Sequence, residues 1–349
     1  MNQVPLLVDL VSDTATRPSD EMRAVMAHAP VGDEQLGEDP SVNALTEKVT
    51  HLLGKPAALF LPSGTMANQI ALAVHCNRGD AILAARNSHI VGSEGAGAAV
   101  LAGAVVLTID APRGIFGEKE LAEIYRPTRV KSPRPAVIEV EQTNNRGGGA
   151  VWPYQKLQEV SNFAREHGLV MHMDGARLMN AVVASGVSAK EYADLCDTVW
   201  IDLSKGLGCP VGSVLAGSED FIEKANVWKH RLGGAMRQAG ILAAAGTYAL
   251  DHHVADLAHD HRRAKDFASF LTLIPSVSLL FNEVETNLIF IDIGKTGLTS
   301  MQISDRLRSR GVRIGVESAT VMRAVFHRDV DDQGLALAKE TFAWAVDAR

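Results

Sequence analysis

The chain has 349 residues and a formal net charge of −7, with 46% hydrophobic and 21% charged residues. This composition excludes a disordered chain and provides enough apolar side chains for a large α/β domain and a smaller one. The acidic balance, without a dense run of Lys and Arg, argues against nucleic acid as a partner.

The cysteines and the first residues indicate a compartment. Cys76, Cys196 and Cys209 are the three cysteines, and none belongs to a CxxC pair. An odd number of scattered cysteines favours a reducing environment over a disulfide framework. The first ten residues lack the pattern of a signal peptide, and no apolar run reaches the ~20 residues that span a bilayer. We therefore expect a cytoplasmic protein with no membrane contact.

Up to residue 216, short apolar runs alternate with longer helical stretches. The helical stretches are 66–76 and 154–167, and in the second one Leu157, Val160 and Phe163 fall on one stripe. The runs predicted to be strands are 57–61, 81–85, 104–109, 136–140, 169–173, 198–203 and 213–216. This alternation predicts an α/β fold with a mostly parallel sheet and helices on both faces.

The rest of the chain predicts a smaller α+β domain. Residues 221–270 have mainly helical character. Beyond them we expect strands at 288–293 and 321–326, a helix at 301–310, and a last helix from Asp332. The predicted domains are 1–265 and 266–349, and the pattern leaves open which of them the N-terminal segment 1–35 packs against.

Ligands of open parallel sheets bind beyond the carboxyl ends of the strands, so polar residues that follow strands are candidates. Ser63, Gly64 and Thr65 follow the strand 57–61 and precede a helix. The amides and dipole of a helix start favour an anion such as a phosphate. The alternative is an ordinary turn in which Ser or Thr caps the helix.

Two further candidates follow later strands. Asp174 comes after 169–173 and could hold a protonated ring nitrogen, or it could form a structural salt bridge with Arg177. Lys205 comes after 198–203 between small residues. A lysine in a tight pocket can form a Schiff base, whereas most turn lysines simply face solvent.

Together these three groups would bind a phosphate, a pyridinium nitrogen and an aldehyde. That combination is typical of pyridoxal 5'-phosphate. A dinucleotide site of the Rossmann type is disfavoured, because no predicted strand is followed by GxGxxG. No set of metal ligands is predicted.

The chain also resembles the L-threonine aldolases, in the β-eliminating lyase and threonine aldolase group of fold-type I pyridoxal-phosphate enzymes. The resemblance covers nearly the whole length. The stretches that carry it are 12–18, 37–40, 62–68, 172–177, 203–208 and 233–240. It implies the fold of that group, with a large domain around a mostly parallel sheet and a smaller C-terminal domain.

The resemblance implies roles for residues of the cofactor site. Lys205 would hold the cofactor, and Asp174 would pair with its ring nitrogen. His89 would stack on the ring, although a surface loop histidine is the simpler interpretation of that residue alone. The phosphate would be bound by Ser63, Gly64 and Thr65.

The resemblance also implies how substrate and subunits are bound. Arg177 and Arg323 would bind the substrate carboxylate and the cofactor phenolic oxygen, assisted by Ser12. For Arg323, a structural ion pair is the alternative. Arg237 would approach the cofactor phosphate of a neighbouring subunit, which implies a homotetramer built as a dimer of dimers.

The implied reaction is retro-aldol cleavage of a β-hydroxy amino acid, such as threonine, allo-threonine or a phenylserine, to glycine and an aldehyde. Asn144 stands where many relatives have a histidine facing the substrate hydroxyl, so a water or His89 would have to be the base. Leu36 and Phe326 replace a tyrosine and a threonine, which favours a more apolar pocket. A β-eliminating lyase, a racemase and a catalytically silent binding protein remain alternatives.

Overall fold

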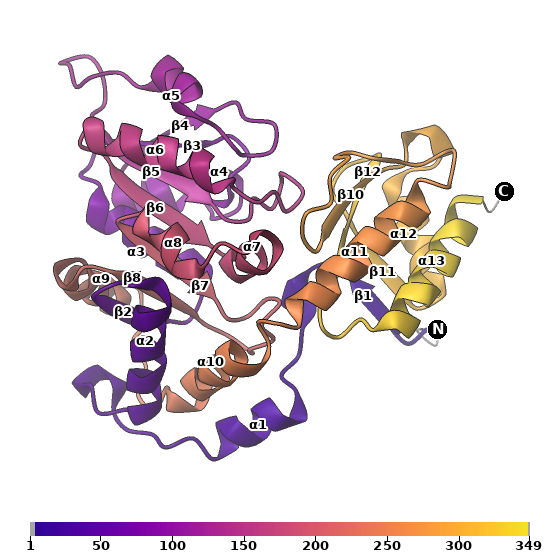
Figure 1. Ribbon diagram of the computed structural model, residues 1–349, viewed down its shortest axis with the longest axis horizontal. Helices are drawn as coiled ribbons and strands as arrows, with labels where there is room; N and C mark the ends of the chain where they lie inside the picture. The colour runs from indigo at the N-terminus through magenta and orange to yellow at the C-terminus, as the bar shows by residue number, and fades with distance from the viewer. Residues whose placement is uncertain (1–3, 348–349) are drawn as a thin grey trace. The chain divides into compact units, whose positions relative to one another are not determined.

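The computed structural model describes residues 4–347, which form two compact units (Figure 1). The sheet unit comprises Pro18–Val254. The small unit comprises the residues before Pro18 and those from Ala255 onward. The small unit thus begins before residue 266, where we predicted a domain border, and it includes the start of the chain.

The sheet unit is built on seven strands in the order β2-β8-β7-β6-β5-β3-β4. Neighbours from β7 to β4 pair in parallel, whereas β8 runs antiparallel to both β2 and β7. The strands are β2 (Ala57–Leu61), β3 (Ala81–Ala85), β4 (Val105–Ile109), β5 (Pro135–Glu141), β6 (Val170–Gly175), β7 (Thr198–Asp202) and β8 (Ser213–Gly217). All seven predicted strands, and the mostly parallel sheet, are confirmed.

Helices lie beside this sheet (Figure 1). They are α1 (Asp20–Ala27), α2 (Pro40–Leu53), α3 (Gly64–His75), α4 (His89–Gly92), α5 (Glu118–Ile124), α6 (Tyr154–Glu166), α7 (Leu178–Ser185), α8 (Ala189–Asp194), α9 (Glu219–Arg231) and α10 (Gly240–His252). Of these, α1 and α10 pack outside the others, α10 on α2 and α1 on α10 (Figure 1). The two helices predicted between strands correspond to α3 and α6. Local chemistry fixes their ends, as in α2, where Asp39 caps the first turn and Gly54 ends the helix with φ 64°.

The sheet is apolar because both of its faces are covered. Every residue of β3, β5, β7 and β8 is buried. Trp200 of β7 and Leu215 of β8 pack with Ala67 and Ile70 of α3 in one cluster. Polar residues are few within these strands and gather mostly at their ends, which carry the candidate site.

The small unit contains a five-stranded sheet in the order β1-β11-β12-β10-β9. Its strands are β1 (Val8–Leu10), β9 (Ser278–Leu279), β10 (Leu288–Asp292), β11 (Val312–Val316) and β12 (Val321–Val325). Its main helices are α11 (Leu257–Leu271), α12 (Ser300–Ser309) and α13 (Asp332–Asp347). Strand β1 pairs in parallel with β11, so the first part of the N-terminal segment packs in the small unit. From Pro18 onward the segment belongs to the sheet unit.

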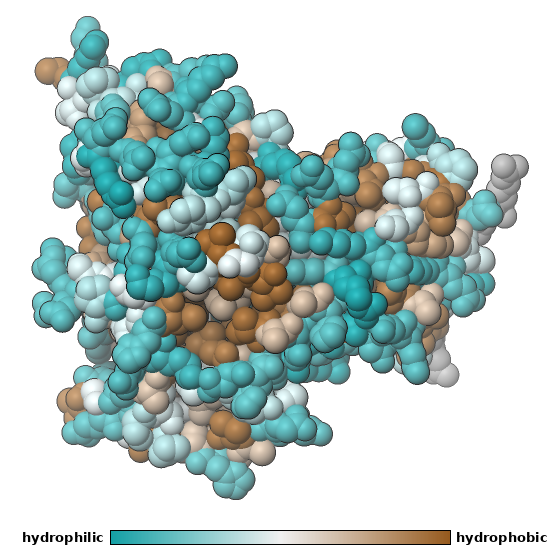
Figure 2. All heavy atoms as spheres, viewed as in Figure 1, coloured by the Kyte–Doolittle hydropathy of each residue, from teal (hydrophilic) through white to brown (hydrophobic). Residues whose placement is uncertain are grey.

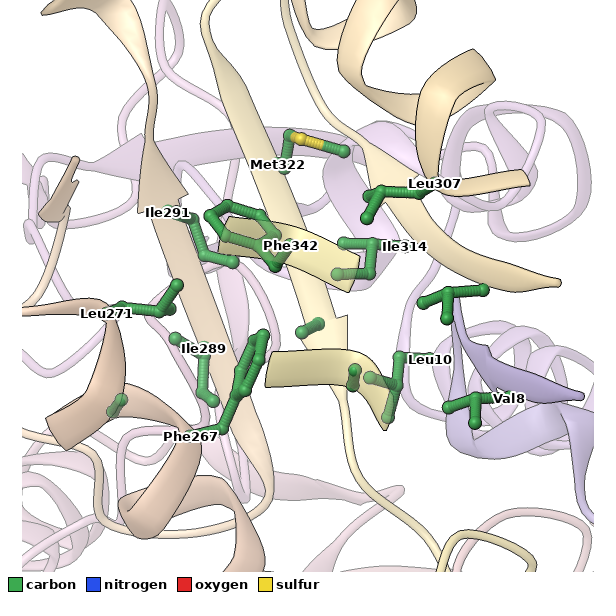
Figure 3. Packing of buried hydrophobic residues seen from close by; sticks show 14 of the residues in the cluster. Val8, Leu10, Phe267, Leu271, Ile289, Ile291, Leu307, Ile314, Met322 and Phe342 are labelled. Carbon is green, nitrogen blue, oxygen red and sulfur yellow. The ribbon is translucent and has the colours of Figure 1, made fainter. Parts of the chain in front are cut away.

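The core of the small unit lies between this sheet and its helices (Figure 3). Phe267 of α11 and Phe342 of α13 pack beside Ile289 and Ile314 of the strands. The face shown in Figure 2 is mostly hydrophilic around its periphery, and hydrophobic residues gather near its centre. Within residues 4–347, no helix combines the length and apolar character that crossing a membrane requires.

Candidate active site

The carboxyl ends of the parallel strands bring together the polar residues of the sheet unit. Strand register places Asp174 of β6 beside Glu141 of β5 on one side and Trp200 of β7 on the other. Lys205 follows the end of β7 at Asp202, and His89 follows the end of β3. The predicted candidates Asp174, Lys205 and His89 therefore share one edge of the sheet.

Asp174 is a buried carboxylate supported only by neutral donors. Its Oδ1 accepts a hydrogen bond from the Ala176 amide at 3.0 Å, and its Oδ2 accepts one from Asn68 Nδ2 at 2.7 Å. Among the described residues it forms no ion pair, so the salt bridge to Arg177 considered from the sequence is not present. A buried charge without a counter-charge is costly, which suits this carboxylate to a cationic ligand atom.

His89 is held at two points. Its amide donates to Glu141 Oε2 at 3.0 Å, and its Nδ1 lies 2.7 Å from Glu94 Oε1. The hydrogen bond to Glu94 raises the pKa of His89, and nearby carboxylates contribute to the same effect. The ring is 35% exposed, and its contacts place His89 beside Glu94 and Glu141 at this edge of the sheet, whereas its role toward a cofactor stays a prediction.

Other buried carboxylates surround this pair. Burial raises the pKa of Glu94, raises that of Glu141 to about 7, and raises that of Glu139 well above its usual value. His89, Glu94 and Asp174 each place one atom within 4.8 Å of the others. Hydrogen bonds among them and with Asn68 account for that closeness, so we assign no metal to it.

Lys205 lies within reach of the same region. Its ammonium forms an ion pair with Asp202, and Nζ is 5.8 Å from the ring centroid of Trp200. Asp202 also accepts hydrogen bonds from the amide and the hydroxyl of Ser204. Because the lysine side chain is only 19% exposed, it is not a solvent-facing turn lysine.

The turn at 63–65 forms the start of α3, as predicted. Ser63 Oγ accepts a hydrogen bond from the Met66 amide at 3.2 Å and caps the helix. A Cβ on Gly64 would lie 2.2 Å from the Trp200 ring. In this structure, glycine is therefore required at 64 by packing against Trp200, a reason that the sequence did not reveal.

Three other predicted residues also belong to the sheet unit. Arg177 is buried, and its amide donates to Gln142 O at 3.0 Å. Arg237 has a side chain that is 61% exposed and pairs with Asp33 at 2.7 Å. Asn144 is buried, and its Oδ1 accepts from the Gly147 amide at 2.7 Å.

Ser12 and Arg323 belong to the small unit. Ser12 Oγ accepts from the Thr14 amide at the start of a short 3-10 helix. Arg323 lies 3.2 Å from Glu317 and donates to Val11 O at 3.1 Å. The structural ion pair considered for Arg323 is thus present, and the roles of Ser12 and Arg323 toward a substrate stay predictions.

Comparison with known proteins places this site in a family. The family model described as "Beta-eliminating lyase" matches residues 9–295. The "Low specificity L-threonine aldolase" of Escherichia coli K12 is 41% identical over 331 residues, which is 95% of this chain and 96% of the relative. This chain belongs to the L-threonine aldolase family. A "Low-specificity L-threonine aldolase 1" of Arabidopsis thaliana is 38% identical over 97% of this chain and 96% of its own.

Solved structures support the threonine aldolase fold. A Leishmania major structure described as a threonine aldolase matches with a TM-score of 0.83 at 21% identity, covering 97% of this chain and 99% of its own. A putative L-allo-threonine aldolase of Listeria monocytogenes matches with a TM-score of 0.80. The resemblance and the fold inferred from the sequence are confirmed. Members of this family are carbon–carbon lyases that use pyridoxal phosphate.

Sequence reasoning missed several residues of this threonine aldolase site. Each of them contacts a residue that was predicted. Asn68 is hydrogen-bonded to Asp174, and Glu94 and Glu141 are hydrogen-bonded to His89. Trp200 and Asp202 contact Lys205. One signal was available for Asn68, which is a polar residue among Ala67, Ile70 and Ala71 on the buried side of α3. Glu94 gave no such signal, because only the folded loop shows that it turns back to His89.

Proposed function

We propose that this chain is a pyridoxal-phosphate-dependent aldolase that cleaves L-β-hydroxy-α-amino acids, such as threonine, to glycine and an aldehyde. The observation that carries the proposal is Asp174, a buried carboxylate with no ion pair among the described residues, at the same sheet edge as Lys205, whose side chain is 19% exposed. The family supports it, because relatives named as low-specificity L-threonine aldolases match nearly the whole chain.

The donor set suits this cofactor. Lys205 would hold it, Asp174 would bind its ring nitrogen, and His89 would lie against its ring. The phosphate would be bound at the start of α3 by Ser63, Gly64 and Thr65, where helix amides favour an anion. When bound, the cofactor supplies a sink for the electron pair that is released as the Cα–Cβ bond breaks.

Arginines would orient the substrate. We assign Arg177 to the carboxylate of the amino acid, because its amide is fixed to Gln142 O directly after the strand end that carries Asp174. A guanidinium can bind a carboxylate through two parallel hydrogen bonds, which fixes orientation as well as charge. For Ser12 and Arg323, the assignment to substrate binding rests on the family alone.

The reaction needs a base for the β-hydroxyl proton, and we assign His89. Its Nδ1 is bonded to Glu94, which leaves Nε2 to take the proton. The Glu94 carboxylate then stabilises the imidazolium and orients the ring. Asn144 cannot take a proton, and the loop already provides its amide with partners in Gly147 and Glu141. Its assignment to the substrate hydroxyl rests on the resemblance.

Product analysis tests the proposal. The purified protein, loaded with pyridoxal phosphate, is incubated separately with L-threonine, L-allo-threonine and the phenylserine stereoisomers. We expect glycine and the matching aldehyde in equal amounts. Formation of a keto acid and ammonia would instead indicate β-elimination, and inversion of the substrate alone would indicate racemisation. No product from any of these substrates, with the cofactor bound, would favour a silent binding protein.

Assembly forms a second part of the proposal. We propose a homotetramer in which Arg237 reaches the cofactor phosphate of a neighbouring subunit, as the resemblance implies. The high exposure of Arg237, and its ion pair with Asp33 alone, leave its guanidinium accessible to such a contact. Light scattering after size-exclusion chromatography gives the mass. A monomer that is fully active would contradict this assignment.

A further inference from the structure

Asn68 is completely buried in α3, behind the turn at 63–65. Its Nδ2 lies 2.7 Å from Asp174 Oδ2 and 2.7 Å from Glu94 Oε1. Its Oδ1 lies 2.6 Å from Trp200 Nε1 and 3.1 Å from His172 Nε2. An amide side chain has two N–H donors and two acceptor positions, so this one uses its full hydrogen-bonding capacity.

The chemistry of the partners fixes which way the amide faces. The indole N–H of Trp200 can only donate, so it must meet Oδ1. Both N–H groups are then directed at the two carboxylates, which can accept. Reversing the amide would place a donor against the indole and an acceptor against Asp174 and Glu94, and would break three bonds at once.

A series of hydrogen-bonded neutral side chains, His172, Thr198 and His75, contacts Asn68 Oδ1 and supports this orientation of the amide. His172 Nδ1 lies 2.9 Å from Thr198 Oγ1, which lies 3.1 Å from His75 Nε2. Burial lowers the pKa of His172 to about 3 and that of His75 to about 4, so both rings are neutral near pH 7. Neutral His172 therefore donates from Nε2 to Asn68 and accepts from Thr198 at Nδ1.

The two carboxylates bridged by Asn68 serve different parts of the proposed site. Glu94 holds the imidazole of His89, and Asp174 ends β6. One oxygen of Glu94 and one of Asp174 lie within 4.8 Å of each other. Two carboxylates this close repel each other and favour the uptake of a proton unless a donor lies between them. Glu139 and Glu141 of β5 lie nearby, and burial raises the pKa of both, so this part of the molecule disfavours a carboxylate that lacks hydrogen-bond donors.

We infer that Asn68 is a positioning residue: by donating one N–H to Asp174 and the other to Glu94, it fixes the carboxylate and the imidazole of His89 in one arrangement. This inference rests on the proposed function. Packing alone does not explain the residue, because its buried neighbours Ala67, Ile70 and Ala71 on the same helix are apolar. An asparagine completely buried among them is costly unless its bonds are needed.

The test measures the bound cofactor rather than turnover. Asn68→Leu keeps the branched shape, with larger terminal groups, and removes both donors. We expect pyridoxal phosphate to bind about ten- to hundredfold more weakly, as loss of hydrogen bonds to charged groups predicts. The hydrogen bond from Asn68 opposes the rise that burial causes in the pKa of Glu94, so its loss should raise that pKa further and leave less negative charge facing the ring. The midpoint of the pH titration of the cofactor's visible absorbance, without substrate, should fall by roughly half a unit to one unit.

Gln69→Met is the matched control. Gln69 follows Asn68 on α3 and donates to the backbone carbonyl of Glu94 at 3.2 Å, but it does not touch either carboxylate. We expect its cofactor affinity to stay within about twofold of the wild type, with an unchanged titration midpoint. If Gln69→Met and Asn68→Leu lose affinity equally, the effect is general to the helix and the inference is wrong.

A second variant covers the case in which Asn68→Leu does not fold. Asn68→Asp keeps the shape but replaces the donor pair with an acceptor, and it should also lose about tenfold or more in cofactor affinity. Wild-type affinity and midpoint in a folded Asn68 variant would overturn the inference and leave the proposed function standing. A wild-type protein that does not bind the cofactor would overturn the proposed function itself, and the inference with it.

Discussion

Two buried carboxylates, one in each compact unit, show how differently this chain treats a buried charge. Asp174 of the sheet unit and Asp260 of the small unit are each 1% exposed. Asp174 accepts hydrogen bonds from Asn68 and from the Ala176 amide. Asp260 accepts none from the described residues, and its nearest cation, Arg263, is 3.8 Å away.

This difference separates a carboxylate arranged for a ligand from one that is merely enclosed. The hydrogen bonds from Asn68 and from the Ala176 amide hold the Asp174 carboxylate at the carboxyl edge of the sheet. Around Asp260, burial dominates and raises its pKa to about 7, although Arg263 acts in the opposite direction. Burial alone therefore does not identify a functional carboxylate. The donors that surround it and its place at a strand end do.

The largest expected effect comes from the amine that shares the edge with Asp174. Lys205→Ala should abolish aldehyde release, because no other amine is assigned to hold the cofactor. Lys205→Arg is the control for charge, since it can keep the ion pair with Asp202 but cannot hold the cofactor covalently. Glycine release is measured for both. Turnover that survives in Lys205→Ala would show that the amine has been misassigned.

Asp174→Asn should lower kcat by on the order of a hundredfold or more, because an amide cannot stabilise a protonated ring nitrogen. The hydrogen bond from the Ala176 amide can remain, so the fold should be kept. Steady-state kinetics with L-threonine measure the loss, and the thermal midpoint of the variant checks its folding. If the variant keeps the wild-type kcat, Asp174 has no role in turnover and does not differ from Asp260 in function.

The ion pair of Lys229 and Glu34 adds a third kind of buried carboxylate to the comparison of Asp174 with Asp260, one with a cation as its partner. Lys229 is buried in α9 and pairs with Glu34, which also accepts from the Met236 amide. Glu34→Ala leaves the ammonium buried without a partner and should lower the free energy of unfolding by about 3–5 kcal/mol. Glu34→Leu with Lys229→Met should cost much less, because no charge stays buried. Urea unfolding distinguishes the two, and equal losses would contradict this account.

The smallest effect is expected at Asp260, and it depends on pH. Because its pKa is raised, the folded protein keeps a proton that the unfolded chain releases between about pH 4 and pH 7. Wild-type stability should therefore fall as pH rises through this window. Asp260→Asn should be more stable than the wild type by about 1–3 kcal/mol at pH 8, and the gain should disappear below about pH 4.

Thermal midpoints at several pH values measure this gain. Asp266→Asn is the control, because Asp266 lies on the same helix, is 48% exposed and pairs with Lys339 at the surface. A pH-independent difference at Asp260 would show that the carboxyl group is not the cause.

The sequence predicted the strands well because a sheet covered on both faces requires uninterrupted apolar runs, such as those of β3 and β7. It also predicted Asp174 and Lys205, because strand ends are where polar residues face a ligand. It could not predict the closeness of Asn68 to both Glu94 and Asp174. Those residues lie far apart along the chain, and only the packing of α3 under the sheet edge brings them together.

Local patterns also misplaced the reason for some residues. Gly64 was predicted only as part of a phosphate-binding turn, and the sequence did not indicate that the Trp200 ring occupies the space that a Cβ at this position would need. Strand β1 has only three residues, and such a short run gives little periodicity. Its partner β11 lies near the other end of the chain, a pairing that no local pattern could indicate.

That pairing orders events during synthesis. Val8–Leu10 leave the ribosome well before Val312–Ile314, the residues with which they pair. Pro18–Val254 meanwhile contains all seven strands of its own sheet and can assemble first. Strand β1 must therefore wait for β11 before it can pair, and the sheet of the small unit is completed only after Pro18–Val254 has been synthesised.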